Sequence, residues 1–112
     1  MSQRAVDAIT DPANRLYLSL SSIWEIGIKS GLGKLGLAVP FSTFMDKAIN
    51  GYGLIVLPIT LDDCVRYQQL PFPDTLHRDP FDRMIITHAL RESLTIVGVD
   101  AAFDAYGLAR LW

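Results

Sequence analysis

Residues 80–100, PFDRMIITHALRESLTIVGVD, decide the fold because they place a helix directly before a short apolar strand. Apolar side chains recur at helical spacing over residues 80–92, which predicts a helix with one inward face. Residues 95–99, TIVGV, are rich in β-branched side chains and short, which predicts a strand buried on both faces. Helices of this length between buried strands are typical of crossover connections in a parallel sheet.

The rest of the chain continues this alternation of helices and strands. Further strands are expected at residues 16–20, 54–59 and 108–112. Further helices are expected at residues 3–10, 22–29, 42–49 and 60–70, and a single helical turn is expected after residue 100. We therefore expect one α/β domain over residues 1–112, with a doubly wound, mostly parallel sheet flanked by helices.

The composition of the chain indicates a folded domain and excludes some classes of protein. Half of the 112 residues are hydrophobic and 20% are charged, which favours a folded domain over a disordered chain. The formal charge of −2 excludes a globally basic nucleic-acid binder, so any such partner has to be met by local Arg and Lys. Cys64 is the single cysteine, which fits a reducing, cytoplasmic compartment. No apolar run is long enough to cross a membrane, and we expect no membrane partner.

Four acidic residues are expected at one edge of the predicted sheet. Helix N-termini lie at the carboxyl edge of parallel strands, where ligands usually bind. Glu25 follows the strand at 16–20, Asp79 and Asp82 begin the helix that precedes TIVGV, and Asp100 ends that strand. Clustered carboxylates suit Mg²⁺ or Mn²⁺, and such ions activate water and neutralise a phosphodiester. The implied reaction is hydrolysis of a phosphate ester.

Helix capping is the competing interpretation of the same acids. Ser22 and Glu25 have the spacing of a capping box, and Asp79 before Pro80 is a typical N-cap. Asp100 is placed to cap the helical turn that follows it. Taken one at a time, capping outweighs catalysis for these residues, and for Asp79 it stays the stronger interpretation.

Asp82 is the hardest of the four to explain by capping. It shares the inward helical face with Ile85, Ile86 and Ala89, where a carboxylate needs a partner because a buried lone charge is expensive. Asp100 ends a buried strand in a similar setting. Glu25 is intermediate because Lys29, four residues on, is a possible surface partner.

Three basic residues flank the acids and are candidates for contacts with RNA phosphates. They are Lys29, Arg78 and Arg83. Solvated or locally paired charges explain them equally well.

Three segments, taken in order, resemble the PIN-domain family, and most closely VapC-type toxins of toxin–antitoxin systems. They are residues 19–35, SLSSIWEIGIKSGLGKL, residues 70–90, LPFPDTLHRDPFDRMIITHAL, and residues 95–112, TIVGVDAAFDAYGLARLW. The resemblance implies a Mg²⁺- or Mn²⁺-dependent endoribonuclease that hydrolyses RNA, forms a homo-oligomer and is held inactive by a cognate antitoxin. Glu25, Asp82 and Asp100 match the family's catalytic, metal-binding acids, and Asp79 matches an additional acid.

The chain departs from the family pattern at its start, where no strand carries a first aspartate in an LLDT-type motif. In the family that strand is the middle of the sheet, so the resemblance is to an N-terminally truncated PIN-like domain. We expect weakened RNA cleavage, and we expect the gap to be removed by pairing of 95–99 with 16–20 or by a neighbouring chain. The alternative function is an inactive remnant that binds an antitoxin or its own copy. A phosphoacceptor signalling domain is a third, weaker possibility.

Overall fold

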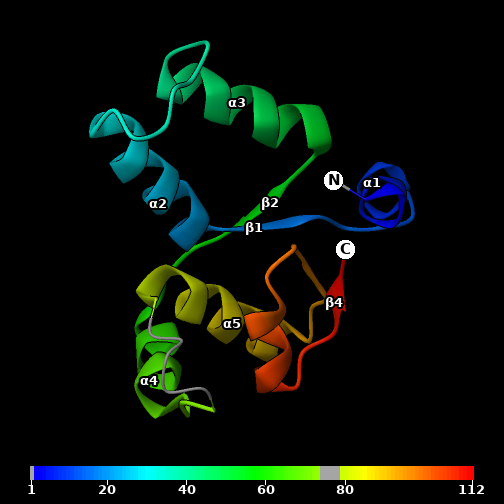
Figure 1. Cartoon of the computed structure of the whole chain (residues 1–112), viewed down its shortest axis with the longest axis vertical. Helices are drawn as coiled ribbons and strands as arrows, with labels where there is room; N and C mark the ends of the chain where they lie inside the picture. The colour runs from blue at the N-terminus through cyan, green and yellow to red at the C-terminus, as the bar shows by residue number, and fades with distance from the viewer. Residues whose placement is uncertain (1, 74–78) are drawn as a thin grey trace.

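The computed structural model describes residues 2–73 and 79–112, and Figure 1 shows an alternation of helices and short strands. The elements are α1 (Gln3–Thr10), β1 (Tyr17–Ser19), α2 (Leu20–Gly31), α3 (Phe41–Tyr52), β2 (Ile55–Leu57), α4 (Leu61–Gln69), α5 (Pro80–Glu92), β3 (Ile96–Val97), η1 (Ala101–Tyr106) and β4 (Arg110–Leu111). Each helix and strand expected from the sequence is present, and the α/β class is confirmed.

The strands form two parallel pairs. β1 pairs with β2, with Tyr17 opposite Ile55, and the connection between them carries α2 and α3. β3 pairs with β4, with Ile96 opposite Arg110, and the connection between them carries η1. Both pairs have the parallel arrangement that the helix–strand alternation predicts.

A continuous sheet is not formed by the described residues. They contain two separate two-stranded sheets, with orders β1-β2 and β3-β4. The expected direct pairing of residues 95–99 with residues 16–20 is likewise absent from this part of the chain, since β3 pairs with β4 and β1 pairs with β2. The architecture is therefore a mixed α/β fold with short parallel strand pairs.

Helix starts follow local capping chemistry, with one correction. The Oγ atom of Ser19 accepts a hydrogen bond from the N–H of Ser21 at 3.1 Å, so α2 begins at Leu20. The expected capping box of Ser22 and Glu25 is wrong, because Ser19 provides the cap three residues earlier. At α5 the expected cap is confirmed: Asp79 is the N-cap and Pro80 is the first helical residue.

Helix α5 is the centre of the packing. Ile86 and Ala89 on this helix form the main core with Leu70, Ile96 and Phe103. The same helix packs against α2 and α4, and it also touches β1. Figure 1 shows α5 below β1, with α4 beneath it and the C-terminal segment that carries β4 at its side. Helix α5 packs against β1 and α2 on one side and against Ile96 of β3 and Phe103 of η1 on the other. It therefore positions the starts of α2 and η1 relative to one another.

Candidate functional site

The first turns of α2 and α5 are joined by a buried contact. The hydroxyl of Ser21 donates a hydrogen bond to the carbonyl oxygen of Phe81 at 2.9 Å. The rings of Trp24 and Phe81 meet edge to face, with centroids 5.4 Å apart and planes at 83°. Glu25 directly follows Trp24 in the sequence, and Asp82 directly follows Phe81. The fold therefore brings two of the predicted acids to adjoining helix starts.

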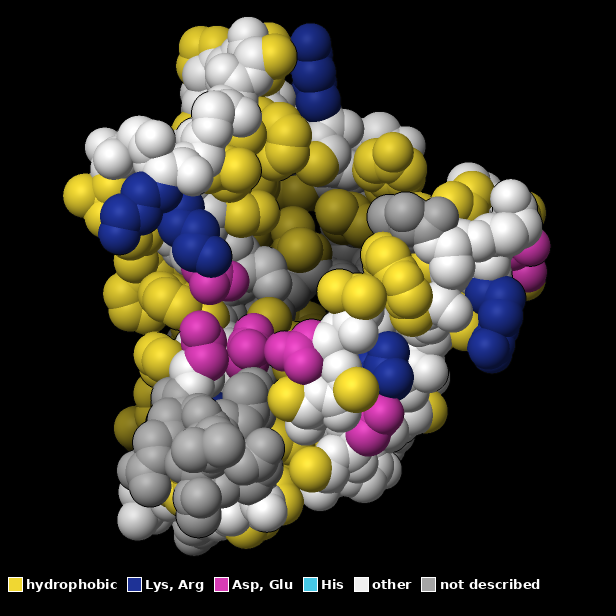
Figure 2. Space-filling model, viewed as in Figure 1, with side chains coloured by type: hydrophobic (Ala, Val, Ile, Leu, Met, Phe, Trp, Pro, Cys, Tyr) yellow, Lys and Arg dark blue, Asp and Glu magenta, His cyan; other side chains and the backbone are white. Residues whose placement is uncertain are grey.

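Acidic side chains form a row across the middle of one face of the molecule, beside a hollow lined with apolar atoms (Figure 2). Asp79 and Asp82 lie at the N-terminus of α5, and Asp100 lies at the N-terminus of η1. Glu25 lies in the first half of α2. Helix N-termini carry a partial positive charge that stabilises nearby carboxylates. The same location also favours binding of a phosphate group once the carboxylates are neutralised.

Each of three acids uses one oxygen for a local contact. Oδ1 of Asp79 accepts from the N–H of Asp82, and Oδ1 of Asp100 accepts from the N–H of Ala102, both at 2.9 Å. Oε2 of Glu25 lies 3.1 Å from Nζ of Lys29. The predicted caps and the predicted surface pair are confirmed. Within residues 2–73 and 79–112, no donor to Oδ2 of Asp79 or of Asp100 is found.

The donor chemistry suits a hard divalent cation. Within residues 2–73 and 79–112, no three acidic, His or Cys side chains are grouped closely enough to hold an ion together. Mg²⁺, however, is commonly bound by one or two carboxylates, with water and substrate phosphate completing its shell. The carboxylates of Asp82 and Asp100, at the starts of α5 and η1, meet that requirement in donor type.

The three candidate RNA-binding residues differ in their placement. Lys29 keeps 53% of its side chain exposed, so its ammonium group is accessible to a phosphate. Arg78 lies outside the described residues. Arg83 is only 2% exposed.

Arg83 has a structural position that its sequence context did not predict. Its guanidinium donates hydrogen bonds to the carbonyl oxygens of Leu70 and Pro71, at 2.8 and 2.9 Å, and lies 3.6 Å from the ring centroid of Phe72. These contacts fix the segment after α4 onto α5. A phosphate contact would require the side chain to leave these buried partners, so we do not include Arg83 in the proposed RNA contact.

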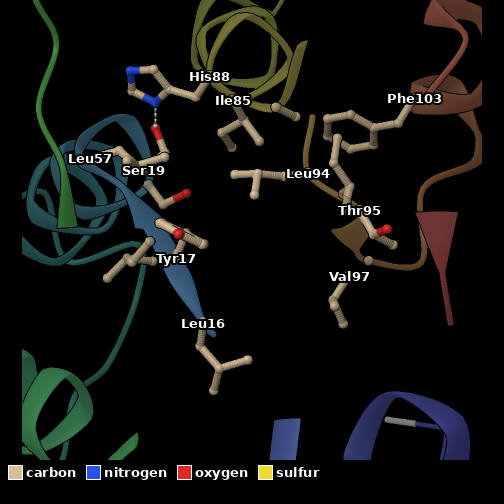
Figure 3. A pocket seen from close by; sticks show the side chains of 15 residues that line it. Leu16, Tyr17, Ser19, Leu57, Ile85, His88, Leu94, Thr95, Val97 and Phe103 are labelled. Atoms are coloured by element: carbon tan, nitrogen blue, oxygen red, sulfur yellow. Dashed lines mark hydrogen bonds between the residues drawn. The ribbon is translucent and has the colours of Figure 1, made fainter. Parts of the chain in front are cut away.

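A second buried polar group was missed by sequence reasoning. Nδ1 of His88 lies 2.9 Å from Oγ of Ser19, and Figure 3 shows the two side chains pointing at each other. Nε2 of His88 lies 3.2 Å from Oδ2 of Asp63, whose Oδ1 lies 2.8 Å from Nε of Arg91. The only sequence signal was a histidine on the inward face of the predicted helix at 80–92. These contacts tie β1, α4 and α5 together.

The electrostatics of this group centre on Asp63. Burial alone raises the pKa of its carboxyl, but hydrogen bonds with Thr60 and the nearby His88 and Arg91 outweigh burial and hold the pKa below its ordinary value. Asp63 is fully buried and also completes a capping box with Thr60 at the start of α4. The group is therefore a charged structural link.

Comparison with known proteins adds no relative. No family model, curated protein or solved structure matches this chain. No helix among the described residues is long and apolar enough to span a bilayer.

Proposed function

We propose that this chain is a metal-dependent endoribonuclease of the PIN-domain, VapC toxin type, belonging to a type II toxin–antitoxin module. The observation that carries the proposal is the acidic row beside the joined starts of α2 and α5. Support also comes from the motifs at residues 19–35, 70–90 and 95–112. Under this proposal, the two separate strand pairs correspond to two parts of the doubly wound sheet of that family.

Asp82 and Asp100 hold the Mg²⁺ or Mn²⁺ ion, with Glu25 and Asp79 nearby. The ion supplies charge neutralisation at the phosphodiester and lowers the pKa of water. Lys29 binds a phosphate of the RNA strand and, through its ion pair, orients Glu25. Ser21 keeps the start of α2 against α5, so that Glu25 and Asp82 stay on one side of the substrate.

The test is cleavage of a single-stranded RNA by the purified chain in the presence of Mn²⁺ or of a chelator. We expect Mn²⁺-dependent cleavage that Asp82→Asn abolishes. Asp46→Asn is the matched control, because Asp46 is an exposed acid on α3, away from the first turns of α2 and α5. Cleavage that survives the chelator, or that both variants reduce equally, contradicts the proposal.

A second candidate function is an inactive module that binds an antitoxin, and the exposed apolar face of α2 favours it. Trp24 is 60% exposed, and Leu20 and Ile28 on the same helix are more than one-third exposed. These residues line one groove with Phe41 and Ile59. An apolar groove along a helix is a typical docking site for an amphipathic helix.

The two candidates differ in a measurable way. Ile28→Ala should weaken capture of the antitoxin encoded beside this gene and leave RNA cleavage unchanged, because Ile28 lines this groove but has no part in the contacts that join α2 to Phe81. If the chain cleaves no RNA with or without Mn²⁺ but still binds that antitoxin, the second candidate is favoured over the first.

A further inference from the structure

A groove of about 290 Å³ separates the two strand pairs, and we call it the inter-sheet slot. Residues 16–19 form one wall and residues 94–98 form the other. Ile85, His88 and Ala89 of α5 contribute its floor. Figure 3 shows β1 on one side of this space and β3 on the other. The slot thus has a strand edge on each side and an apolar helix beneath.

The β1 wall presents unpaired backbone groups to the slot. The N–H of Ile55 donates to the carbonyl oxygen of Leu16 at 2.8 Å, and Tyr17 is the residue opposite Ile55. In a parallel ladder, the residue opposite turns its own N–H and C=O away from that partner strand. The N–H and C=O of Tyr17 therefore point away from β2, toward the slot.

The β3 wall has the same pattern. The N–H groups of Ile96 and Gly98 donate to the carbonyl oxygens of Ala109 and Leu111, at 2.9 and 3.1 Å. Backbone groups alternate in direction along a strand, so those of Thr95 and Val97 point away from β4. No described residue provides a hydrogen-bond partner for the slot-facing backbone of Tyr17, Thr95 or Val97.

We propose that the slot binds an extended segment of another polypeptide, which pairs with β1 on one edge and β3 on the other. The completed sheet has the order β2, β1, donated strand, β3, β4. A single strand presents N–H and C=O groups alternately to its two sides, and the slot walls offer groups at every second residue to match. This hydrogen-bond complementarity distinguishes the slot from an apolar groove that any hydrophobic group fills.

The walls also define the chemistry of the occupant. Its side chains on the floor side contact Ile85, Leu94 and Phe103, so they are apolar. Both of its edges must be free before binding. Each of the four described strands already uses one edge for its neighbour, so a strand of a second copy does not fit between the walls. The occupant is therefore a segment without sheet partners of its own, as in donor-strand complementation.

The probe is the capped peptide acetyl-Lys-Thr-Val-Ile-Val-Lys-amide, added to the isotope-labelled full chain. We expect saturable binding that slows hydrogen exchange of the Tyr17 and Val97 amides at least about tenfold, because both become ladder donors. The matched control peptide has the same sequence with N-methyl groups on Val and Ile. It keeps the charge and the apolar surface but lacks the donors, so its affinity should fall at least about tenfold.

A pair of protein variants tests the location. Val97→Pro removes the slot-facing N–H while keeping the Ile96 and Gly98 hydrogen bonds to β4, since proline is tolerated at a free strand edge. Val56→Pro removes the equivalent N–H from the outer edge of β2, on the side away from β1 and the slot. Val97→Pro should weaken peptide binding at least about tenfold, and Val56→Pro should leave it unchanged.

Three results overturn the proposal. One is the lack of saturable peptide binding in the millimolar range. A second is binding of the N-methyl peptide to the unsubstituted protein with the same affinity as the unmethylated peptide. This comparison needs no variant, so it remains valid if a proline variant fails to fold. The third is self-association in sedimentation that Val97→Pro abolishes, which would make the occupant a second copy.

Discussion

The hydroxyl of Ser21 lies 2.9 Å from the carbonyl oxygen of Phe81, and this contact joins residues that are 60 positions apart in the sequence. Ser21 is almost completely buried, so the hydrogen bond forms where water does not compete. It holds the start of the helix with Glu25 against the start of the helix with Asp82. The relative position of these two acids depends on a side chain that carries no charge.

Replacing Ser21 by Ala tests this dependence. The change leaves the carbonyl of Phe81 without its donor, and we expect the free energy of unfolding to fall by about 1–2 kcal/mol. Ser22→Ala is the matched control, because Ser22 is only partly buried on the same turn. Chemical denaturation of both variants measures the difference, and equal stability of the two would show that the contact contributes nothing.

Asp100→Asn separates capping from metal binding. Asn is as good an N-cap as Asp, so η1 should keep its cap from residue 100 and the stability without metal should change by less than about 0.5 kcal/mol. Loss of the charge should nevertheless weaken Mn²⁺ binding, measured by calorimetry or by the Mn²⁺-induced rise in Tm.

Asp100→Ala provides the complementary control. It removes the cap as well and should lower stability by about 1 kcal/mol. Unchanged Mn²⁺ affinity in both variants would leave Asp100 with a capping role alone.

Lys29→Met should reduce RNA binding through the loss of one phosphate contact. Each such contact contributes about 0.7 to the slope of log affinity against log salt for single strands, so the slope should flatten by about that amount. Lys47→Met is the control, because Lys47 is an exposed lysine on α3, outside the elements that carry the acids. Fluorescence anisotropy over a salt series measures the slope, and equal slopes for the two variants would exclude Lys29 from the RNA contact.

Asp63 should make stability depend on pH in the acidic range. Because the folded pKa of Asp63 is lowered, its contribution is present above the unfolded pKa of about 3.8 and is lost as pH falls through the folded value. The groups facing it are Thr60, His88 and Arg91. Asp63→Asn should cost on the order of 3 kcal/mol at neutral pH, since it leaves Arg91 without its buried counter-ion.

The difference in unfolding free energy between the wild-type chain and Asp63→Asn should shrink below about pH 4. Denaturation curves at several pH values measure it. A constant difference from pH 7 to pH 3 would show that ionisation of Asp63 contributes nothing to stability.

Local chemistry made much of the molecule predictable from its sequence. Hydrophobic periodicity marked α5, and β-branched side chains marked β3, because both signals arise from neighbours within one element. Asp79 before Pro80 identified the start of α5, and the fold has the cap that this pair predicts. The parallel pairing of strands followed from the helices between them, since such connections return the chain to the same end of the sheet.

Tertiary structure decided what depends on partners distant in the sequence. Arg83 has the sequence context of an exposed phosphate ligand, yet the carbonyls of Leu70 and Pro71 and the ring of Phe72 enclose it. His88 has no local partner, and only the fold brings it to Ser19 and Asp63. The sequence by itself determined which segments are strands. Which strand edges are paired depends on long-range hydrogen bonds, and these leave the backbone of Tyr17 and Val97 facing an open slot.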